Sequence, residues 1–396
     1  MNFQAIAKAL GIEVYPQELE SVYENLSQDS MDICNIPYIE ALEEEYQLFG
    51  EYFELVKSAA GQIKADEVRR AWGQTVCTFL RDHACLGMPK IPVPESDGSL
   101  AADMLPLLIL LPLIPQTAEH YRAAGIEEEA IRRIVKTFGG CIKSTELRVG
   151  RPGVSAMYYN WQMLYIKVVL LPYGSFNFEL RNLPKGEDGV WILKNRTTGE
   201  ILPVMNGGTY HRSGMVLGSA GFEDSEGAFT AEFNQTEDAY IGHPAINNLV
   251  SNAPQTYPKS QWECVLEPGD LVISVHIPKG ADLSPEAVER SYREGMALIG
   301  EKFPQYAPKC LFCSSWLMDP ALEEMLGSES KIAKFLNGYV KFPISSAGRE
   351  VYSFVFVGFK GELEDLPENT RLERALKKKY LAGEYIHAFR GVQFLE

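Results

Sequence analysis

Apolar residues recur at steps of three and four along the first 145 residues, a spacing that places them on one face of a helix. Three such stripes are Leu42, Tyr46, Phe49, Phe53 and Val56; Trp72, Val76, Phe79 and Leu80; and Ile131, Ile134, Val135 and Phe138. Glycines at 11, 87 and 125 mark helix ends. The pattern predicts an α-helical N-terminal domain over residues 1–145.

From residue 146 onward, short β-branched and aromatic runs alternate with turn residues, which predicts a β-rich domain over residues 146–396. The predicted strands include Met163–Leu171, Ser175–Leu180, Gly214–Gly218, Ala228–Phe233, Trp262–Leu266 and Val351–Phe359. Residues 203–258 are rich in Gly, Asn and Pro and are predicted to form a hairpin and loop-rich insertion. A helix is expected at Arg371–Tyr380. The fold class is therefore α+β.

The composition, with 46% apolar and 23% charged residues, is typical of a globular protein. The net charge of −16 disfavours nucleic acid and anionic membranes as partners. The most apolar stretch, Met104–Ile114, is interrupted by prolines and is shorter than the ~20 residues of a membrane span, so we expect a buried helix. Seven scattered cysteines and an N-terminus without a secretory pattern favour a cytoplasmic location.

Residues 271–316 read as strand, helix, strand. Leu271–Ile277 and Cys310–Trp316 are the strands, and Ser284-Pro285-Glu286 begins a helix that continues to Gly300. Short joints predict that the two strands are parallel and joined by a right-handed crossover. The C-terminal ends of the strands, at His276 and at residues 313–319, are then expected at one edge of the sheet, where α/β sheets place ligands.

Several residues at this edge have both a structural and a functional interpretation. Cys313, His276 and Asp319 have the residue types of a thiol hydrolase, but a cysteine in mid-strand is expected to be buried. His276 is either a core histidine or a catalytic base. Four residues at the end of the second strand, Ser314, Ser315, Trp316 and Asp319, are either structural or parts of the site. In the structural interpretation Asp319 caps a helix, Trp316 lies in the core and a serine bridges the strand end. A zinc site usually needs four ligands, and the sequence offers no second pair of ligands at a suitable spacing to join Cys310 and Cys313, so no bound metal is expected.

No glycine-rich phosphate motif of the mononucleotide or dinucleotide type is present. Lys279 and Gly280, just before the crossover helix, are the best-placed anion site, although Glu286 in the first turn opposes it.

Residues 267–337 resemble the C-terminal domain of a bacterial acyltransferase family. The resemblance rests on four segments: Pro268-Gly-Asp-Leu-Val-Ile-Ser-Val-His-Ile-Pro278, Leu283-Ser-Pro-Glu-Ala-Val288, Cys313-Ser-Ser-Trp-Leu-Met-Asp-Pro320, and Ser330-Lys-Ile332 followed by Phe335. The family pairs a helical N-acyltransferase-type domain with a domain similar to the GNAT fold, and the first half of the chain, including Gly125-Ile-Glu-Glu-Glu-Ala-Ile131, looks like the helical partner.

The resemblance implies that acyl-CoA lies between two splayed parallel strands, with its pyrophosphate at the start of the connecting helix. The residues that it implies for the donor are Ser274, Lys279, Gly280 and Ser284, and those for the substrate are Cys313 and Trp316. His276 or a water that it holds would take the proton of the amine, Ser315 or backbone N–H groups would polarise the thioester carbonyl, and Asp319 would orient the base or bind the acceptor ammonium. The [QR]-x-x-G-x-[GA] phosphate loop of GNAT enzymes is missing.

These expectations describe an N-acyltransferase that moves an acyl group from acyl-CoA to an amine on a small molecule or peptide. The alternative is a non-catalytic protein that binds a small molecule or a partner in the same sheet-edge cleft.

Overall fold

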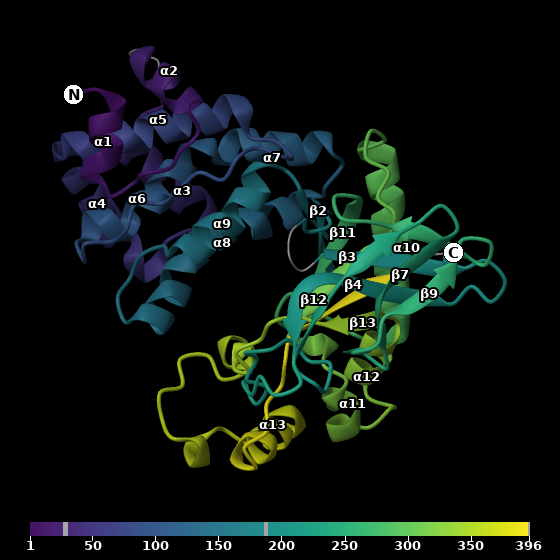
Figure 1. Cartoon of the computed structure of the whole chain (residues 1–396). Coiled ribbons are helices and arrows are strands. Elements are labelled where there is room, and N and C mark those ends of the chain that lie inside the picture. The colour runs from purple at the N-terminus through teal and green to yellow at the C-terminus, as the bar shows by residue number, and fades with distance from the viewer. Residues whose placement is uncertain (27–30, 186–188, 395–396) are drawn as a thin grey trace. The chain divides into compact units, whose positions relative to one another are not determined.

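The computed structural model describes residues 1–26, 31–185 and 189–394. The chain divides into two compact units, Met1–Leu171 and Pro172–Glu396 (Figure 1). The division falls after Leu171 and not after residue 145, because the helical region is longer than its periodicity indicated.

The N-terminal unit is built from helices. They are α1 Phe3–Ala9, α2 Glu18–Glu24, α3 Ile36–Tyr46, α4 Phe53–Ala65, α5 Glu67–His83, α6 Leu100–Leu110, α7 Ile114–Ala123, α8 Glu128–Val149 and α9 Ala156–Ile166, with 3₁₀ turns at Gly50–Tyr52 and Leu111–Leu113. The helical character predicted for this region is confirmed.

Two details of the predicted helical region differ in the structure. The stripe from Leu42 to Val56 belongs to two helices, because Gln47 takes a left-handed conformation and ends α3. The strand predicted at Met163–Leu171 is wrong at its start, since α9 runs to Ile166 and only the last residues enter a strand. The aromatic residues of α9 are also typical of strands, and a short apolar run does not distinguish a helix from a strand.

The apolar segment Leu100–Ala123 is long and apolar enough to cross a membrane by length and composition alone. In the structure 67% of its most apolar window is buried within the protein. Leu110 and Ile114, on either side of the 3₁₀ turn, are each at most 2% exposed. This burial is typical of a core helix, as the sequence predicted.

The C-terminal unit contains two sheets. Its strands are β1 Leu170–Tyr173, β2 Phe176–Asn182, β3 Gly189–Asn195, β4 Ile201–Tyr210, β5 Phe229–Ala231, β6 Phe233–Gln235, β7 Ala239–Ile246, β8 Leu249–Val250, β9 Gln255–Pro258, β10 Trp262–Leu266, β11 Leu271–His276, β12 Leu311–Ser315, β13 Val340–Pro343 and β14 Phe389–Gln393. Its helices are α10 Pro285–Lys302, α11 Ala321–Leu326, α12 Lys331–Asn337 and α13 Arg371–Leu381. The mixed α+β fold is confirmed.

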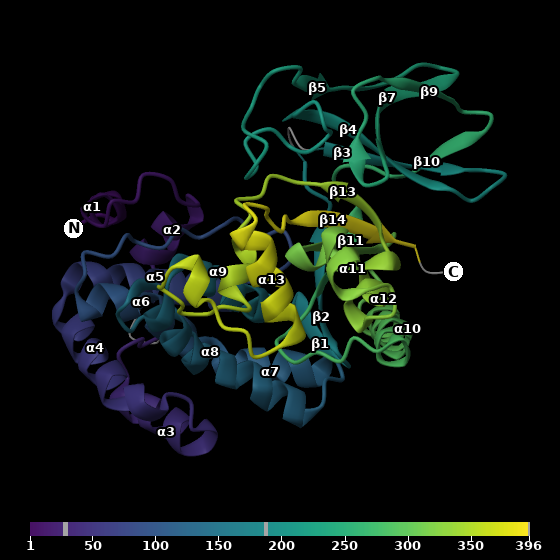
Figure 2. The same cartoon turned by 90° about the horizontal axis from the view of Figure 1, so that it is seen from below.

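Within the described residues, the first sheet has the strand order β1-β2-β11-β12-β14-β13, and the second follows β10-β3-β4-β7-β6 with β5, β8 and β9 attached. Figure 2 shows α10, α11 and α12 on one side of the first sheet and the second sheet on the other. A shared hydrophobic core joins the sheets, with Val272 and Phe312 contributed by the first and Ile192 and Met205 by the second.

Residues 203–258 are therefore more than an insertion of a hairpin and loops, because they supply most of β4 and all of β5 to β9 of the second sheet. The run Gly214–Gly218 makes only an isolated bridge, from Val216 to Tyr210. The arrangement depends on pairing between short strands that are far apart in the chain, so local sequence patterns do not predict it.

The strand predicted at Val351–Phe359 is also wrong. The segment forms a 3₁₀ turn at Glu350–Ser353 and further turns. The place in the sheet next to β12 is taken by β14, from the end of the chain.

Candidate functional site

The strands β11 and β12 are parallel and joined by α10, as the sequence predicted. They pair only at Ile273–Leu311 and Ser274–Phe312. Beyond these pairs, and within the described residues, Val275 and His276 are registered with β2 alone, while the last three residues of β12 are registered with β14 alone. The two strands thus separate at their C-terminal ends, and the separation leaves backbone polar groups on each strand facing the gap.

The helices α10 and α12 cover one face of the sheet around this gap. The ring of Tyr292 on α10 lies 5.3 Å from that of Phe176, and the ring of Phe335 on α12 lies 5.7 Å from Phe176. Gly295 approaches so closely that an added Cβ would lie 2.5 Å from Phe178. The side chains of Phe176 and Phe178 therefore mark the helix-covered face, and alternate residues along the strands point to the opposite face.

The opposite face carries polar side chains where the strands separate. The register places Asn177, His276, Ser314 and Arg390 in one row across the strands, with Glu179 and Ser274 in the row before it. Val272 and Phe312, further from the strand ends, belong to the core between the sheets. The polar row therefore begins where the coverage by the second sheet stops.

His276 is hydrogen-bonded to Glu179 across the β2–β11 pair. The distance from His276 Nε2 to a Glu179 carboxylate oxygen is 2.7 Å. The Glu179 side chain is 11% exposed and that of His276 is 27% exposed. The Glu179 carboxylate beside Nε2 holds the imidazole ring in one orientation. This pair has the chemistry of a general base with its orienting acid.

Ser314 and Ser315 lie on opposite faces of β12. Ser315 shares the helix-covered face with Cys313, and its hydroxyl oxygen accepts the N–H of Leu317 at 3.1 Å, which caps the 3₁₀ turn Trp316–Met318. Ser314 is exposed and lies in the row of His276. The strand alternation thus brings Ser314, rather than the predicted Ser315, to the face that carries the histidine.

Asp319 is 5% exposed and occupied by backbone donors. One carboxylate oxygen accepts the N–H of His387 at 2.6 Å, and the other accepts the N–H of Ala321 at 2.9 Å. Burial raises the pKa of this carboxyl, while the backbone hydrogen bonds act in the opposite direction. These contacts hold the start of α11. Asp319 was predicted to orient His276, but the carboxylate that is hydrogen-bonded to His276 is that of Glu179.

Cys313 is fully buried, and burial raises the pKa of its thiol to about 12. The thiolate that a nucleophilic cysteine needs is therefore disfavoured. Trp316 is 7% exposed, and its ring lies 6.5 Å from that of Phe354.

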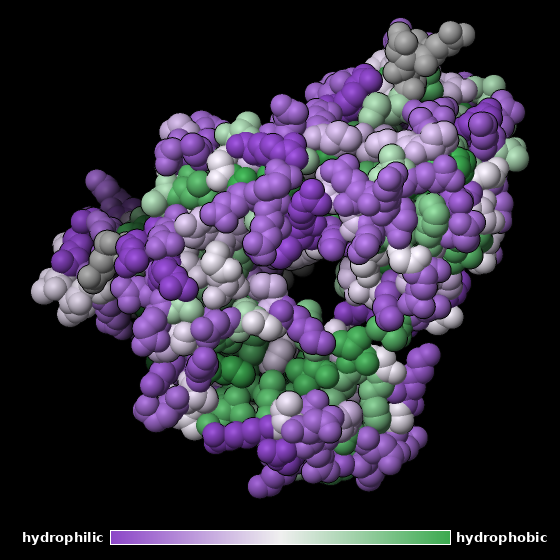
Figure 3. All heavy atoms as spheres, turned by 180° about the vertical axis from the view of Figure 1, so that it is seen from behind, coloured by the Kyte–Doolittle hydropathy of each residue, from purple (hydrophilic) through white to green (hydrophobic). Residues whose placement is uncertain are grey.

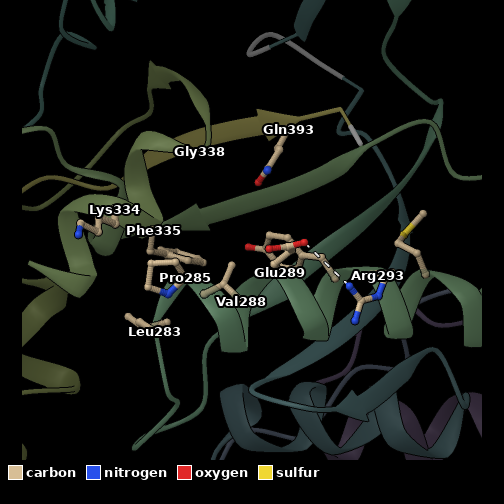
Figure 4. A pocket seen from close by; sticks show the side chains of 11 residues that line it. Leu283, Pro285, Val288, Glu289, Arg293, Lys334, Phe335, Gly338 and Gln393 are labelled. Carbon is tan, nitrogen blue, oxygen red and sulfur yellow. Dashed lines mark ion pairs between the residues drawn. The ribbon is translucent and has the colours of Figure 1, made fainter. Parts of the chain in front are cut away.

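A groove of about 630 Å³ runs between α10 and α12 on the helix-covered face. Pro285, Val288 and Tyr292 line it from α10, Lys334 and Phe335 from α12, and Gln393 from the end of β14. Figure 4 shows Gln393 pointing from β14 towards the side chains of α10. The groove has mainly apolar walls. Its charged side chains are paired: Lys334 lies 2.9 Å from Glu329, and Arg293 lies 3.9 Å from Glu289, which also lines the groove.

The segment before α10 contains three of the four predicted donor-binding residues, Lys279, Gly280 and Ser284. Lys279 and Gly280 are exposed, and Gly280 takes a positive φ of 84°. The Ser284 hydroxyl donates to Asp282 at 2.9 Å rather than capping the helix. Asp282 is also paired with Lys331 at 2.8 Å, and its pKa is lowered to about 2 by that lysine and by Ser284. Ser274 is 2% exposed on β11.

Among the residues described, no group of three or more His, Cys, Asp or Glu side chains is arranged to hold a metal ion.

Glu179 is a site residue that sequence reasoning missed, and among the strand-end serines it assigned the catalytic role to Ser315 and not to Ser314. Glu179 is far from His276 in the chain, and only the pairing of β2 with β11 brings it within hydrogen-bonding distance. Side chains alternate between the two faces of a strand, so only one of the two serines can share the face of His276. Choosing Ser314 required the register between the two strands, which the sequence does not give.

Comparisons with known proteins agree with this architecture. Residues 171–393 match the model of GNAT-like C-terminal domains, and residues 38–168 match that of N-acyltransferase N-terminal domains. A comparison with curated proteins finds no match.

Solved structures of similar fold include an acyltransferase in complex with decanoyl-CoA, with 16% identity and a TM-score of 0.64. Another is an acyltransferase with decanoyl-CoA and teicoplanin, with 17% identity and a TM-score of 0.63. A third is an acyltransferase with CoA and 10C-teicoplanin, with 16% identity and a TM-score of 0.61. In each case 100% of both chains is covered. At this identity the similarity shows the acyltransferase fold.

Proposed function

Because the chain belongs to the family that joins an N-acyltransferase N-terminal domain to a GNAT-like C-terminal domain, we propose that it transfers an acyl group from acyl-CoA to an amine. The observation that carries the proposal is the separation of β11 and β12 after Ser274 and Phe312. A groove between α10 and α12, on the helix-covered face of the same sheet, accompanies it. Two of the similar acyltransferase structures contain decanoyl-CoA, one of them together with teicoplanin, and a third contains CoA and 10C-teicoplanin. We also propose that the acceptor is an amine on a small molecule or peptide and that the protein acts in the cytoplasm.

The donor would cross the sheet at the gap. Its nucleotide end would lie in the groove, with Lys279, Gly280 and Ser284 near the phosphates, and its pantetheine arm would hydrogen-bond to the strand backbone at Val275 and His276. The thioester would then reach the opposite face beside His276 and Ser314. This path explains why the groove and the polar row lie on different faces of one sheet.

The reaction needs few groups. The amine nitrogen attacks the thioester carbonyl carbon and forms the C–N bond, His276 or a water that it holds takes the amine proton, and the C–S bond breaks to release CoA, which is protonated at sulfur. Glu179 orients the imidazole, and the Ser314 hydroxyl donates to the carbonyl oxygen as negative charge develops on it. Ser315 and Asp319, engaged in backbone contacts, hold the strand end that carries these groups.

Isothermal titration with CoA and acetyl-CoA tests the donor site. We expect binding by the wild type and its loss in Val288→Trp, whose indole would fill the groove. Arg290→Trp, on the same helix but outside the groove lining, is the matched control and should bind as the wild type does. A folded wild-type protein that gives no heat at millimolar CoA would contradict the proposal.

The competing function is a non-catalytic binding protein. Asp282 and Glu286 at the start of α10 favour it, because both carboxylates oppose a phosphate there. Release of CoA thiol from acyl-CoA in the presence of primary amines separates the two functions, since a binding protein releases none.

A further inference from the structure

Arg390 on β14 stands in the polar row where the strands separate. The register pairs it with Ser314 of β12 on one side and with Phe342 of β13 on the other. Side chains directly opposite each other on neighbouring antiparallel strands have Cβ atoms about 4.5–5.5 Å apart, so Arg390 and Ser314 are adjacent on one face. Phe342 is fully buried, whereas Arg390 is partly exposed. Arg390 thus lies at the border of the core, beside the proposed donor to the thioester oxygen.

Of the four residues in the polar row, only Arg390 is permanently charged. Glu179, the carboxylate on the same face, lies 2.7 Å from His276 and 3.7 Å from Arg181. The whole protein carries a net charge of −16, and hydrophilic side chains cover most of the face seen in Figure 3. So acidic a molecule repels an anionic substrate unless a cation stands at the site. Arg390 supplies that cation in the row of the proposed base.

We propose that Arg390 binds a carboxylate of the acceptor, which makes the acceptor an amino acid or a short peptide that carries both an amine and a carboxylate. This inference rests on the proposed function and names the substrate class of the same site. The guanidinium presents its N–H groups in a planar fork that matches a carboxylate and pairs with it through two parallel hydrogen bonds.

The spacing of the strands sets the distance between the two groups of such an acceptor. The amine nitrogen would approach the thioester carbonyl between His276 and Ser314, and the carboxylate would lie one strand further along the row, about 5 Å away. Pairing with Arg390 also withdraws the carboxylate from the ammonium form of the acceptor, which it would otherwise stabilise, and so favours the neutral amine that attacks. Arg390 orients the acceptor and takes no part in bond making.

The test compares pairs of acceptors that differ by one group. Glycylglycine and alanine carry a carboxylate, and glycylglycinamide and alaninamide carry an amide in its place. Release of CoA thiol from acetyl-CoA gives kcat/KM for each acceptor, expressed per neutral amine. For the wild type we expect a preference of about 10-fold to 100-fold for the carboxylate in at least one pair, because the amide loses the hydrogen bonds between charged partners. The preference should arise mainly in KM.

Variants assign this preference to Arg390. Arg390→Gln should reduce the ratio of carboxylate to amide acceptor to below about threefold, and Arg390→Lys, which keeps the charge without the fork, should leave an intermediate ratio. Arg181→Gln removes a cation of the same face that is paired in register with Val272, away from the strand ends, and should keep the wild-type ratio. A general loss of stability affects both acceptors equally, so a merely structural role of Arg390 would not change the ratio.

Equal kcat/KM for carboxylate and amide in both pairs would overturn the carboxylate site, as would a ratio that survives in Arg390→Gln. Release with ethanolamine but with neither glycylglycine nor alanine would overturn it as well. The wild-type ratio and Arg390→Lys keep the test decisive if Arg390→Gln does not fold. Absence of thiol release with every one of these amines, ethanolamine included, would instead refute the proposed function itself.

Discussion

His276 Nε2 lies 2.7 Å from a carboxylate oxygen of Glu179, on the antiparallel neighbour of its strand. The two residues lie 97 positions apart in the chain, and the described strands of the second sheet all come from the segment between them. The proposed base is therefore oriented by a residue from the beginning of the C-terminal unit, and its side chain stands on the face of the sheet opposite α10.

This pair predicts different kinetic effects for its two members. His276→Gln should lower kcat about 10²-fold to 10⁴-fold, because the group that takes the amine proton is lost. Glu179→Gln should lower kcat less, on the order of tenfold, with KM for acyl-CoA unchanged, since Glu179 acts through the imidazole. Glu179→Asp should recover part of the loss. Steady-state release of CoA thiol measures these effects, and an unchanged kcat in both variants with reduced thermal stability would assign the pair to folding alone.

The two neighbouring serines should behave oppositely. Ser314→Ala is expected to reduce kcat about tenfold or more without changing stability, because an exposed donor to the developing oxyanion is removed. Ser315→Ala should reduce the free energy of unfolding by about 1 kcal/mol through loss of a cap, with a smaller effect on kcat. Urea unfolding and initial rates distinguish the two, and the reverse result would return the carbonyl-polarising role to Ser315.

Thiol labelling tests the burial of Cys313. Six of the seven cysteines have pKa values raised to between about 11 and about 12 by burial. A raised thiol pKa favours the protonated form below that pH, so at pH 8 only about one part in 10³ to 10⁴ of these groups is thiolate. Cys85 is exposed. Iodoacetamide should modify one cysteine quickly in the native protein and seven in denaturant, and fast modification of Cys313 would revive a thiol mechanism.

Two glycines of α10 form a matched pair for stability. At Gly295 an added Cβ would lie 2.5 Å from the fully buried ring of Phe178, so Gly295→Ala should cost about 1–3 kcal/mol of unfolding free energy. At Gly300 an added Cβ meets nothing within 4 Å, and Gly300→Ala should stabilise the protein by about 0.5–1 kcal/mol through helix propensity. Denaturant titration measures both. A neutral Gly295→Ala would mean that α10 shifts easily away from the sheet.

Local patterns were sufficient for the crossover unit. The strand Leu271–His276 and the helix Pro285–Lys302 lie within two residues of their predicted bounds, because Ser284, Pro285 and the proline after the first strand mark the boundaries locally. The same reasoning failed at Val351–Phe359, where apolar residues form turns and β14 occupies the position in the sheet. It failed also for residues 203–258, whose strands pair over long separations.

By itself the sequence determined the helical first half, the parallel pair joined by α10, and the location of His276 at the end of its strand, because caps, prolines and apolar periodicity act over a few residues. The tertiary structure decided which carboxylate meets His276, which serine shares its face and where the two strands part. These features depend on register between segments far apart in the chain, and a shift of one residue would turn every side chain of a strand to its other face.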